Sequence, residues 1–100
     1  MKTFRQPDEL FAKLKDALPA LKLQYHVDTL EIFGSFVRGE ATKDSDLDLL
    51  VTFDEDPTLF KFVALENHLS DMLSVKVDLV MKESLKPRIG KRILAEARPL

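Results

Sequence analysis

Three aspartates in this chain are the residues most able to do chemistry together. Asp46 and Asp48 stand two positions apart where a strand-like alternation begins. Because a strand sends alternate side chains to the same face, both carboxylates leave that face about 7 Å apart along the backbone. Two converging carboxylates raise each other's pKa unless a cation bridges them, and Mg²⁺ takes such oxygen ligands. If the strand carrying Asp78 pairs beside the first, Asp78 completes a three-carboxylate site, as a second-metal ligand and a proton acceptor for an attacking hydroxyl.

The Asp-x-Asp pair has two other interpretations. Alternating polar residues are ordinary on a half-exposed strand, so the pair alone is weak evidence for a metal. The acids from Asp44 to Glu55 also have the spacing of an EF-hand calcium loop. Leu49, however, stands where that loop needs glycine for its sharp turn, and the segment around it is strongly strand-like. The calcium interpretation is therefore rejected, and the ordinary strand stays open.

A glycine and a serine precede the acids and have the chemistry of a phosphate site. Gly34 allows a phosphate to approach the backbone closely, and Ser35 adds a hydroxyl and an amide donor. If residues 36–39 begin a helix, its N-terminus adds positive potential, and Arg38 could bind phosphates or brace the acidic cluster. The same residues also suit a plain turn, with serine as a cap and arginine as an ion-pair partner.

Apolar periodicity predicts the elements that must position these residues. The expected elements are a helix from Pro7 that ends or kinks at Pro19, strands at 29–33, 47–53 and 75–80, a short turn or helix through 39, a helix from a cap at Asp56 to about Leu73, and a helix from Pro87 to about Arg98. In the long helix, Leu59 and Val63 are expected on the buried face. This order predicts a small sheet covered by helices.

Composition and charge narrow the class of protein. The chain has 100 residues, 45% hydrophobic and 32% charged, without cysteine, so we expect one globular domain over 1–100 without disulfides or thiolate zinc sites. A net charge of −2, a longest apolar run of only 62–65 and no signal-like N-terminus indicate a cytoplasmic protein that binds neither membranes nor nucleic acid. Residues 28–56 carry nine acids and two bases, whereas 81–100 carry six bases and two acids. A metal ion or this basic tail is expected to balance the acidic centre.

Together these residues are no longer ordinary. Gly34-Ser35, ten further residues, Asp46-Leu47-Asp48 and a later strand aspartate, Asp78, resemble the nucleotidyltransferase superfamily typified by DNA polymerase β. The stretch 34–51 is similar to its minimal branch, the MNT proteins, which are the antitoxin halves of HEPN–MNT toxin–antitoxin pairs. The resemblance covers most of the chain, to the basic segment at 86–88, and the Gly-Ser and Asp-x-Asp spacing is its specific part.

The resemblance implies a fold, a reaction and a role for each motif residue. The implied fold is α/β, a small mixed β-sheet flanked by helices. Gly34 and Ser35, with Arg38, would bind the triphosphate of ATP. Asp46 and Asp48 would bind two Mg²⁺ ions, with Asp78 as the third catalytic and metal-binding carboxylate. The implied reaction is attack of a hydroxyl on the α-phosphate of ATP, which transfers AMP and needs in-line geometry and charge neutralisation.

The resemblance also implies a partner. Larger nucleotidyltransferases carry a second domain for the acceptor, and since this chain has none, we expect the acceptor on a separate protein. In the family it is a tyrosine of the HEPN partner, an RNase-type toxin, so a hetero-oligomer with the toxin is expected. Two alternatives remain open: a non-catalytic antitoxin that neutralises its toxin by binding, and a small-molecule nucleotidyltransferase.

Overall fold

The computed structural model describes residues 7–100, which form helices packed on a four-stranded sheet. The elements follow in the order α1 (Pro7–Tyr25), β1 (Val27–Phe33), α2 (Ser35–Arg38), β2 (Leu47–Phe53), α3 (Leu59–Leu73), β3 (Val77–Met81), the 3₁₀ helix η1 (Lys82–Ser84), α4 (Pro87–Glu96) and β4 (Arg98–Pro99). The sheet has the order β3-β2-β1-β4, in which β2 and β3 run parallel and the other pairs antiparallel. The predicted fold class, a small mixed sheet flanked by helices, is confirmed.

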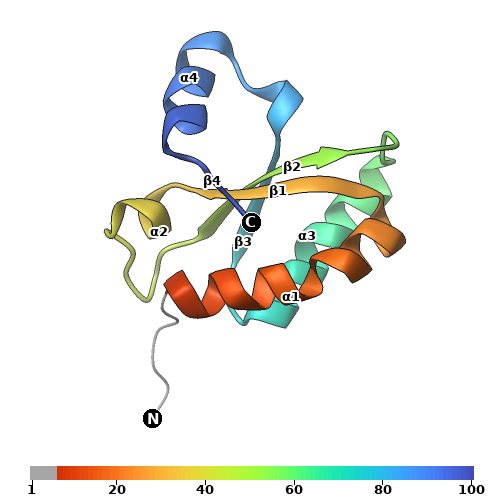
Figure 1. Cartoon of the computed structure of the whole chain (residues 1–100), viewed down its shortest axis with the longest axis horizontal. Coiled ribbons are helices and arrows are strands. Elements are labelled where there is room, and N and C mark those ends of the chain that lie inside the picture. Colours follow the sequence, from red (N-terminus) through yellow and green to blue (C-terminus); the bar gives the residue numbers. More distant parts are fainter. Residues whose placement is uncertain (1–6) are drawn as a thin grey trace.

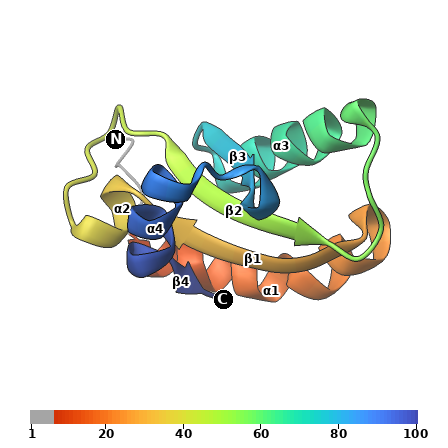
Figure 2. The same ribbon diagram turned by 90° about the horizontal axis from the view of Figure 1, so that it is seen from above.

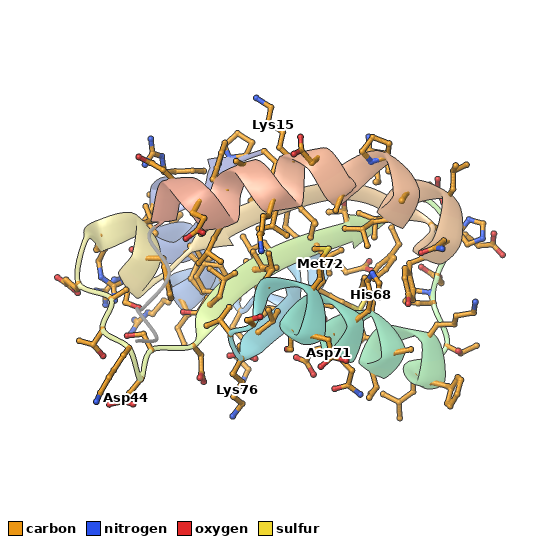
Figure 3. All side chains as sticks on the ribbon, turned by 90° about the horizontal axis from the view of Figure 1, so that it is seen from below. Lys15, Asp44, His68, Asp71, Met72 and Lys76 are labelled. Atoms are coloured by element: carbon orange, nitrogen blue, oxygen red, sulfur yellow. The ribbon has the colours of Figure 1, made fainter. Side chains whose placement is uncertain are left out.

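The two faces of the sheet are covered differently. Helices α1 and α3 lie side by side against one face, and α4 lies over the other (Figure 1, Figure 2). The core lies between the first face and its two helices, because β2 sends Leu47, Leu49 and Val51 to that side. Seen from the helical side, Met72 lies between α1 and α3, whereas Lys15 points away from the body (Figure 3).

Helix α1 continues through Pro19 to Tyr25, so of the two predicted outcomes at this proline, an end or a kink, the end is wrong. A proline removes one helical hydrogen bond, but Pro19 is exposed. Leu14 before it and Leu21 after it are both fully buried, so packing holds the two halves of the helix against the same core. Although α1 reaches 19 residues, no helix within residues 7–100 is both long and apolar enough to cross a membrane.

Helix α3 begins two residues later than predicted. Its cap is Thr58, whose hydroxyl accepts the backbone N–H of Lys61 at 3.1 Å, and not Asp56. The buried row is Leu65, Leu69 and Leu73. Leu59 is 79% exposed and Val63 43% exposed, so their predicted burial is wrong. The reason is the four-residue spacing of the leucine row, which turns these two positions away from the sheet.

The remaining boundaries differ from prediction by a few residues. Strand β1 starts at Val27, and β3 starts at Val77 because Ser74, in the left-handed region at φ 55°, ends α3 and leaves residues 75–76 as a connection. Helix α4 ends at Glu96, since the chain then extends into β4, which pairs with β1. A two-residue strand has no periodicity from which it could be predicted.

Candidate active site

Gly34 lies at the end of β1, directly beside the carboxylate of Asp48. The register pairs Phe33, the last residue of β1, with Asp48 of β2. Gly34 has φ 83° and ψ −154°, and a Cβ atom there would overlap the Asp48 carboxylate. Both the backbone conformation and the close approach therefore require glycine at this position.

Asp48 and Asp78 are direct partners across the parallel strands β2 and β3. Their side chains share the sheet face opposite α1 and α3, since the residues next to Asp48 point into the core. Burial, Asp78 and Asp46, in that order, raise the pKa of Asp48 from 3.8 to about 6, against the smaller opposite effect of Arg38. The structure thus brings two of the three predicted carboxylates together and makes ionisation of the more buried one costly.

Asp46, unlike Asp48 and Asp78, is not part of a cross-strand pair. It is exposed, just before β2, and its carboxylate lies 3.9 Å from the Lys76 ammonium group. Within residues 7–100, no three His, Cys, Asp or Glu side chains lie close enough to form a ready metal cluster. The donor set nevertheless fits Mg²⁺, which is commonly held by one or two carboxylates together with substrate phosphates. Asp48 and Asp78 are such a pair of oxygen donors.

Ser35 and Arg38 lie in the short helix α2, which the sequence predicted. The Gly34 carbonyl accepts the N–H groups of Val37 and Arg38 at 3.0 and 3.2 Å. This turn fixes the backbone positions of Ser35 and Arg38. The Arg38 guanidinium donates to Glu40 at 2.9 Å and to Glu96 at 3.0 and 3.1 Å. These hydrogen bonds raise the pKa of Arg38. Arg38 is therefore a fixed positive charge beside Gly34.

Glu96, at the end of α4, belongs to this site although the sequence analysis missed it. Its carboxylate accepts the Gly34 N–H at 2.7 Å as well as the Arg38 guanidinium. The Gly34 hydrogen bond is the largest cause that lowers the pKa of Glu96, and the Arg38 hydrogen bond adds to it. Glu96 lies 62 residues from Gly34, and the one signal in the sequence is that it is the sole acid in the basic stretch 84–100.

The basic C-terminal segment balances part of the acidic centre. Lys82 donates to Glu31 of β1 at 2.8 Å, and the Glu31 side chain is only 13% exposed. The expected neutralisation by the tail is therefore seen at Glu31. Asp48 and Asp78, in contrast, have no basic residue of the tail as a hydrogen-bond or ion-pair partner within the described residues.

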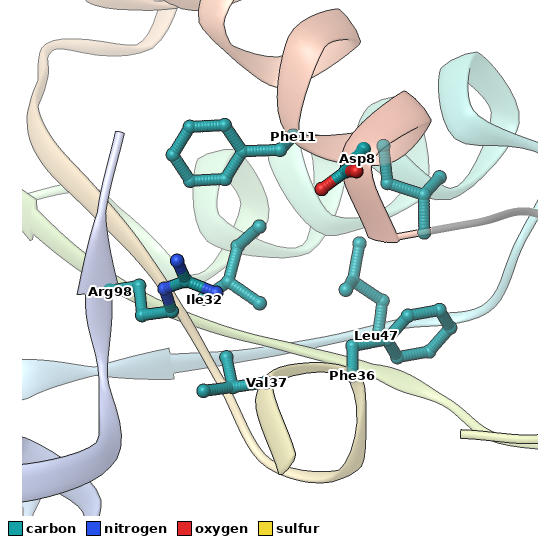
Figure 4. Close-up of a pocket in the computed structure, with 8 residues that line it drawn as sticks. Asp8, Phe11, Ile32, Phe36, Val37, Leu47 and Arg98 are labelled. Atoms are coloured by element: carbon teal, nitrogen blue, oxygen red, sulfur yellow. The ribbon is translucent and has the colours of Figure 1, made fainter. Parts of the chain in front are cut away.

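A cavity of about 200 Å³ lies behind α2, between α1, β1 and β4. Figure 4 shows Phe11, Ile32, Val37 and Leu47 around it, with Asp8 and Arg98 as its charged residues. Its lining does not include the paired aspartates, and it is separate from the site at Gly34.

Comparison with known proteins assigns the family. The model of the nucleotidyltransferase domain matches residues 12–100 of the chain. The chain belongs to the nucleotidyltransferase domain family. Protein adenylyltransferase MntA of Thermococcus cleftensis is 51% identical over 76 residues, which cover 76% of this nucleotidyltransferase and 77% of that protein. The predicted family and the predicted class of enzyme are thereby confirmed.

Solved structures agree with this assignment. One described as a candidate minimal nucleotidyltransferase has a TM-score of 0.83 at 38% identity, over 99% of this chain and 100% of that chain. A Shewanella oneidensis structure, a tri-AMPylated HEPN toxin in complex with an MNT antitoxin, has a TM-score of 0.59 at 18% identity, over 93% and 66% of the two chains. The second likeness shows that the fold is shared. In the structure, Gly34 and Ser35 follow the end of β1, and Asp46 and Asp48 lie at the start of β2, at the same end of these two antiparallel strands.

Proposed function

We propose that this chain is an antitoxin that transfers AMP from ATP to a tyrosine hydroxyl of a HEPN RNase toxin. The observation that carries the proposal is the pairing of Asp48 with Asp78 beside Gly34 and Ser35. The relative from Thermococcus cleftensis is named a protein adenylyltransferase, and an MNT antitoxin has been solved with an AMPylated HEPN toxin. Both names support a protein acceptor.

Each motif residue has a role in this proposal. The amide and hydroxyl of Ser35, the backbone of Gly34 and the guanidinium of Arg38 bind the triphosphate. Asp46, Asp48 and Asp78 would hold two Mg²⁺ ions. When bound, such ions neutralise charge that develops on the phosphates and make a hydroxyl more nucleophilic.

The transfer itself is a substitution at phosphorus. The tyrosine oxygen attacks the α-phosphorus of ATP in line, so that an O–P bond forms while the bond to the β-phosphate oxygen breaks and pyrophosphate leaves. The proton of the tyrosine hydroxyl passes to the Asp78 carboxylate, which is exposed and therefore open to an acceptor from outside. The whole chain 1–100 acts as one domain, with the acceptor side supplied by the toxin in a hetero-oligomer. We expect the reaction in the cytoplasm, where ATP is available.

The direct test is the intact mass of the HEPN protein encoded beside this chain, after incubation with this protein, ATP and Mg²⁺. We expect a gain of whole AMP units. The gain should vanish with the double variant Asp46→Asn, Asp48→Asn and persist with Asp71→Asn, which removes an exposed charge from α3. An AMP gain that survives the double variant would contradict the proposal.

A binding-only antitoxin is the second candidate, and two contacts favour it. Asp46 has Lys76 as an ion-pair partner at 3.9 Å, and the Glu96 carboxylate already accepts the Gly34 N–H. A stable complex with the toxin, formed equally by wild type and the double variant without any mass gain, would establish this alternative.

A further inference from the structure

The Glu96 carboxylate binds two groups at once, the backbone N–H of Gly34 and the guanidinium of Arg38. The Glu96 carboxylate accepts the Gly34 N–H at 2.7 Å and the Arg38 guanidinium at 3.0 and 3.1 Å, and the Glu96 side chain is only 25% exposed. A carboxylate and a phosphate oxygen take the same kind of donor, and charge-assisted bonds of this length are the strong ones. Glu96 thus holds the donors that bind the triphosphate in the proposed function, on which this inference rests.

We propose that Glu96 is an internal competitor of the nucleotide: the triphosphate displaces its carboxylate from Gly34 and Arg38, and Glu96 thereby sets nucleotide affinity. A single backbone N–H cannot make a full hydrogen bond to two anions, and a carboxylate that stayed in place would repel the triphosphate. The effect of Glu96 is on binding, and it leaves the chemical step to the aspartates on the neighbouring strands.

Helix α4 is built so that Glu96 can leave. Among its residues, all of which the structure describes, Gly90 alone is buried, while Ile89 is 60% and Leu94 46% exposed. A cavity of about 170 Å³ lies between Arg38 and the face of α4 that carries Arg92 and Glu96. The helix therefore has few packed side chains to lose and space beside it into which Glu96 can turn.

Arg92 gives the displaced carboxylate a second partner. It lines the same cavity, and its charge already acts on Glu96, whose pKa it helps to lower. Moving from Arg38 toward Arg92 keeps Glu96 beside a cation, so displacement does not leave an isolated charge.

The alternative is that Glu96 braces the site by holding Gly34 and Arg38 in position. The two roles predict opposite signs. Removing a competitor strengthens binding of a polyphosphate, whereas removing a brace weakens it. Displacement also frees α4, so its amides should exchange hydrogen faster when the ligand is bound, while a brace predicts slower exchange.

The experiment measures binding of inorganic tripolyphosphate to wild type, Glu96→Gln and Glu96→Ala by calorimetry. Glu83→Gln removes the same charge from exposed η1 and is the matched control. We expect the Kd for tripolyphosphate to fall about fivefold for Glu96→Gln, as for loss of one competing carboxylate, and to stay unchanged for Glu83→Gln. We also expect faster exchange of the α4 amides in liganded wild type. Glutamine keeps the shape of the side chain, so this variant decides the matter if the alanine variant is less stable.

The outcomes separate this inference from the proposed function. Unchanged or weaker tripolyphosphate binding by Glu96→Gln would overturn the inference, even if AMP transfer to the toxin is intact. Tighter binding by Glu96→Gln, with no AMP transfer by wild type, would uphold the inference and remove the proposed function.

Discussion

The two faces of the sheet differ in chemistry: one carries the apolar core and the other carries the paired aspartates. On the face toward α1 and α3, β2 places Leu47, Leu49 and Val51, each at most 1% exposed. On the other face the same strand places Asp48 beside Asp78 of β3, under the loosely packed α4. Because side chains alternate along a strand, one seven-residue segment supplies both core leucines and one carboxylate of the acidic pair.

The comparison shows where stability is gained and where it is lost. The core face gains free energy from apolar burial, and the structure describes no buried polar residue within 7–100. The acidic face keeps two carboxylates side by side, one with its pKa raised to about 6. Titratable groups with perturbed pKa values cluster at functional sites, where a ligand of opposite charge stabilises their ionised form.

The largest effect on stability is expected from the core face. Replacing the fully buried Leu69 by alanine removes apolar contacts and leaves a cavity, so the free energy of unfolding should fall by about 3 kcal/mol. Urea denaturation measures this, while AMP transfer per folded molecule should stay within twofold. A loss of transfer by the fully folded variant would show that the two faces are not independent.

Gly34→Ala, on the acidic face, should lower the free energy of unfolding by about 2 kcal/mol and stop AMP transfer. The added Cβ meets the Asp48 carboxylate and sits at φ 83°, so both overlap and backbone strain contribute. Gly39→Ala is the matched control, since Gly39 has φ 73° but nothing within 4 Å of an added Cβ. Gly39→Ala should lower the free energy of unfolding by only about 1 kcal/mol and keep AMP transfer. Equal losses of activity in both variants would mean that the contact with Asp48 is irrelevant.

Asp48→Asn should stabilise the protein at pH 7 while it abolishes transfer. A pKa raised from 3.8 to about 6 means that the folded state holds the proton more tightly than the unfolded state. The penalty of ionised Asp48 is therefore absent below pH 4, grows between pH 4 and 6, and is complete above 6. Since the carboxylate is only half-buried, solvent screening leaves a gain of about 1–2 kcal/mol for the variant.

Chemical denaturation across pH 4–7 tests this prediction. The advantage of Asp48→Asn over wild type should appear as pH rises through the range from 4 to 6. Asp28→Asn, at an exposed position of β1, should leave the free energy of unfolding nearly unchanged at every pH. If Asp48→Asn is destabilising at pH 7, burial and the neighbouring carboxylates do not disfavour ionised Asp48 as described.

The smallest effect concerns the helix that completes the core face. Thr58→Ala removes the cap of α3 and should cost about 1 kcal/mol, because the N–H of Lys61 loses its partner. Asp56→Ala should change the free energy of unfolding by less than about 0.5 kcal/mol. A larger effect at Asp56 in urea denaturation would restore it as the cap.

The sequence predicted what is local and periodic. Strand β2 is bounded as expected, since apolar residues occupy every second position from Leu47 to Phe53. Gly34, Ser35 and the first two aspartates were selected as candidate site residues by their spacing along the chain. That Asp78 lies opposite Asp48 depends on strand pairing, which a motif alone does not specify.

The errors have physical causes. Thr58 and Asp56 are both good caps, and only packing of the Leu65–Leu73 row selects the start of α3. Pro19 was expected to end or kink α1, and tertiary contacts on both sides of the proline continue the helix through it. Glu96 reaches Gly34 only after α4 folds back over the sheet, so the sequence marks it only as the sole acid among the bases of 84–100.

The most direct test of this account is the midpoint temperature of unfolding as Mg²⁺ is added in the presence of ATP. If Asp48 and Asp78 repel until a divalent cation binds, wild type should gain about 1.4 kcal/mol, or several degrees, at tenfold the Kd. Asp48→Asn should start at a higher temperature and gain almost nothing. Equal increases in wild type and Asp48→Asn would contradict the claim that this pair holds the metal and the nucleotide.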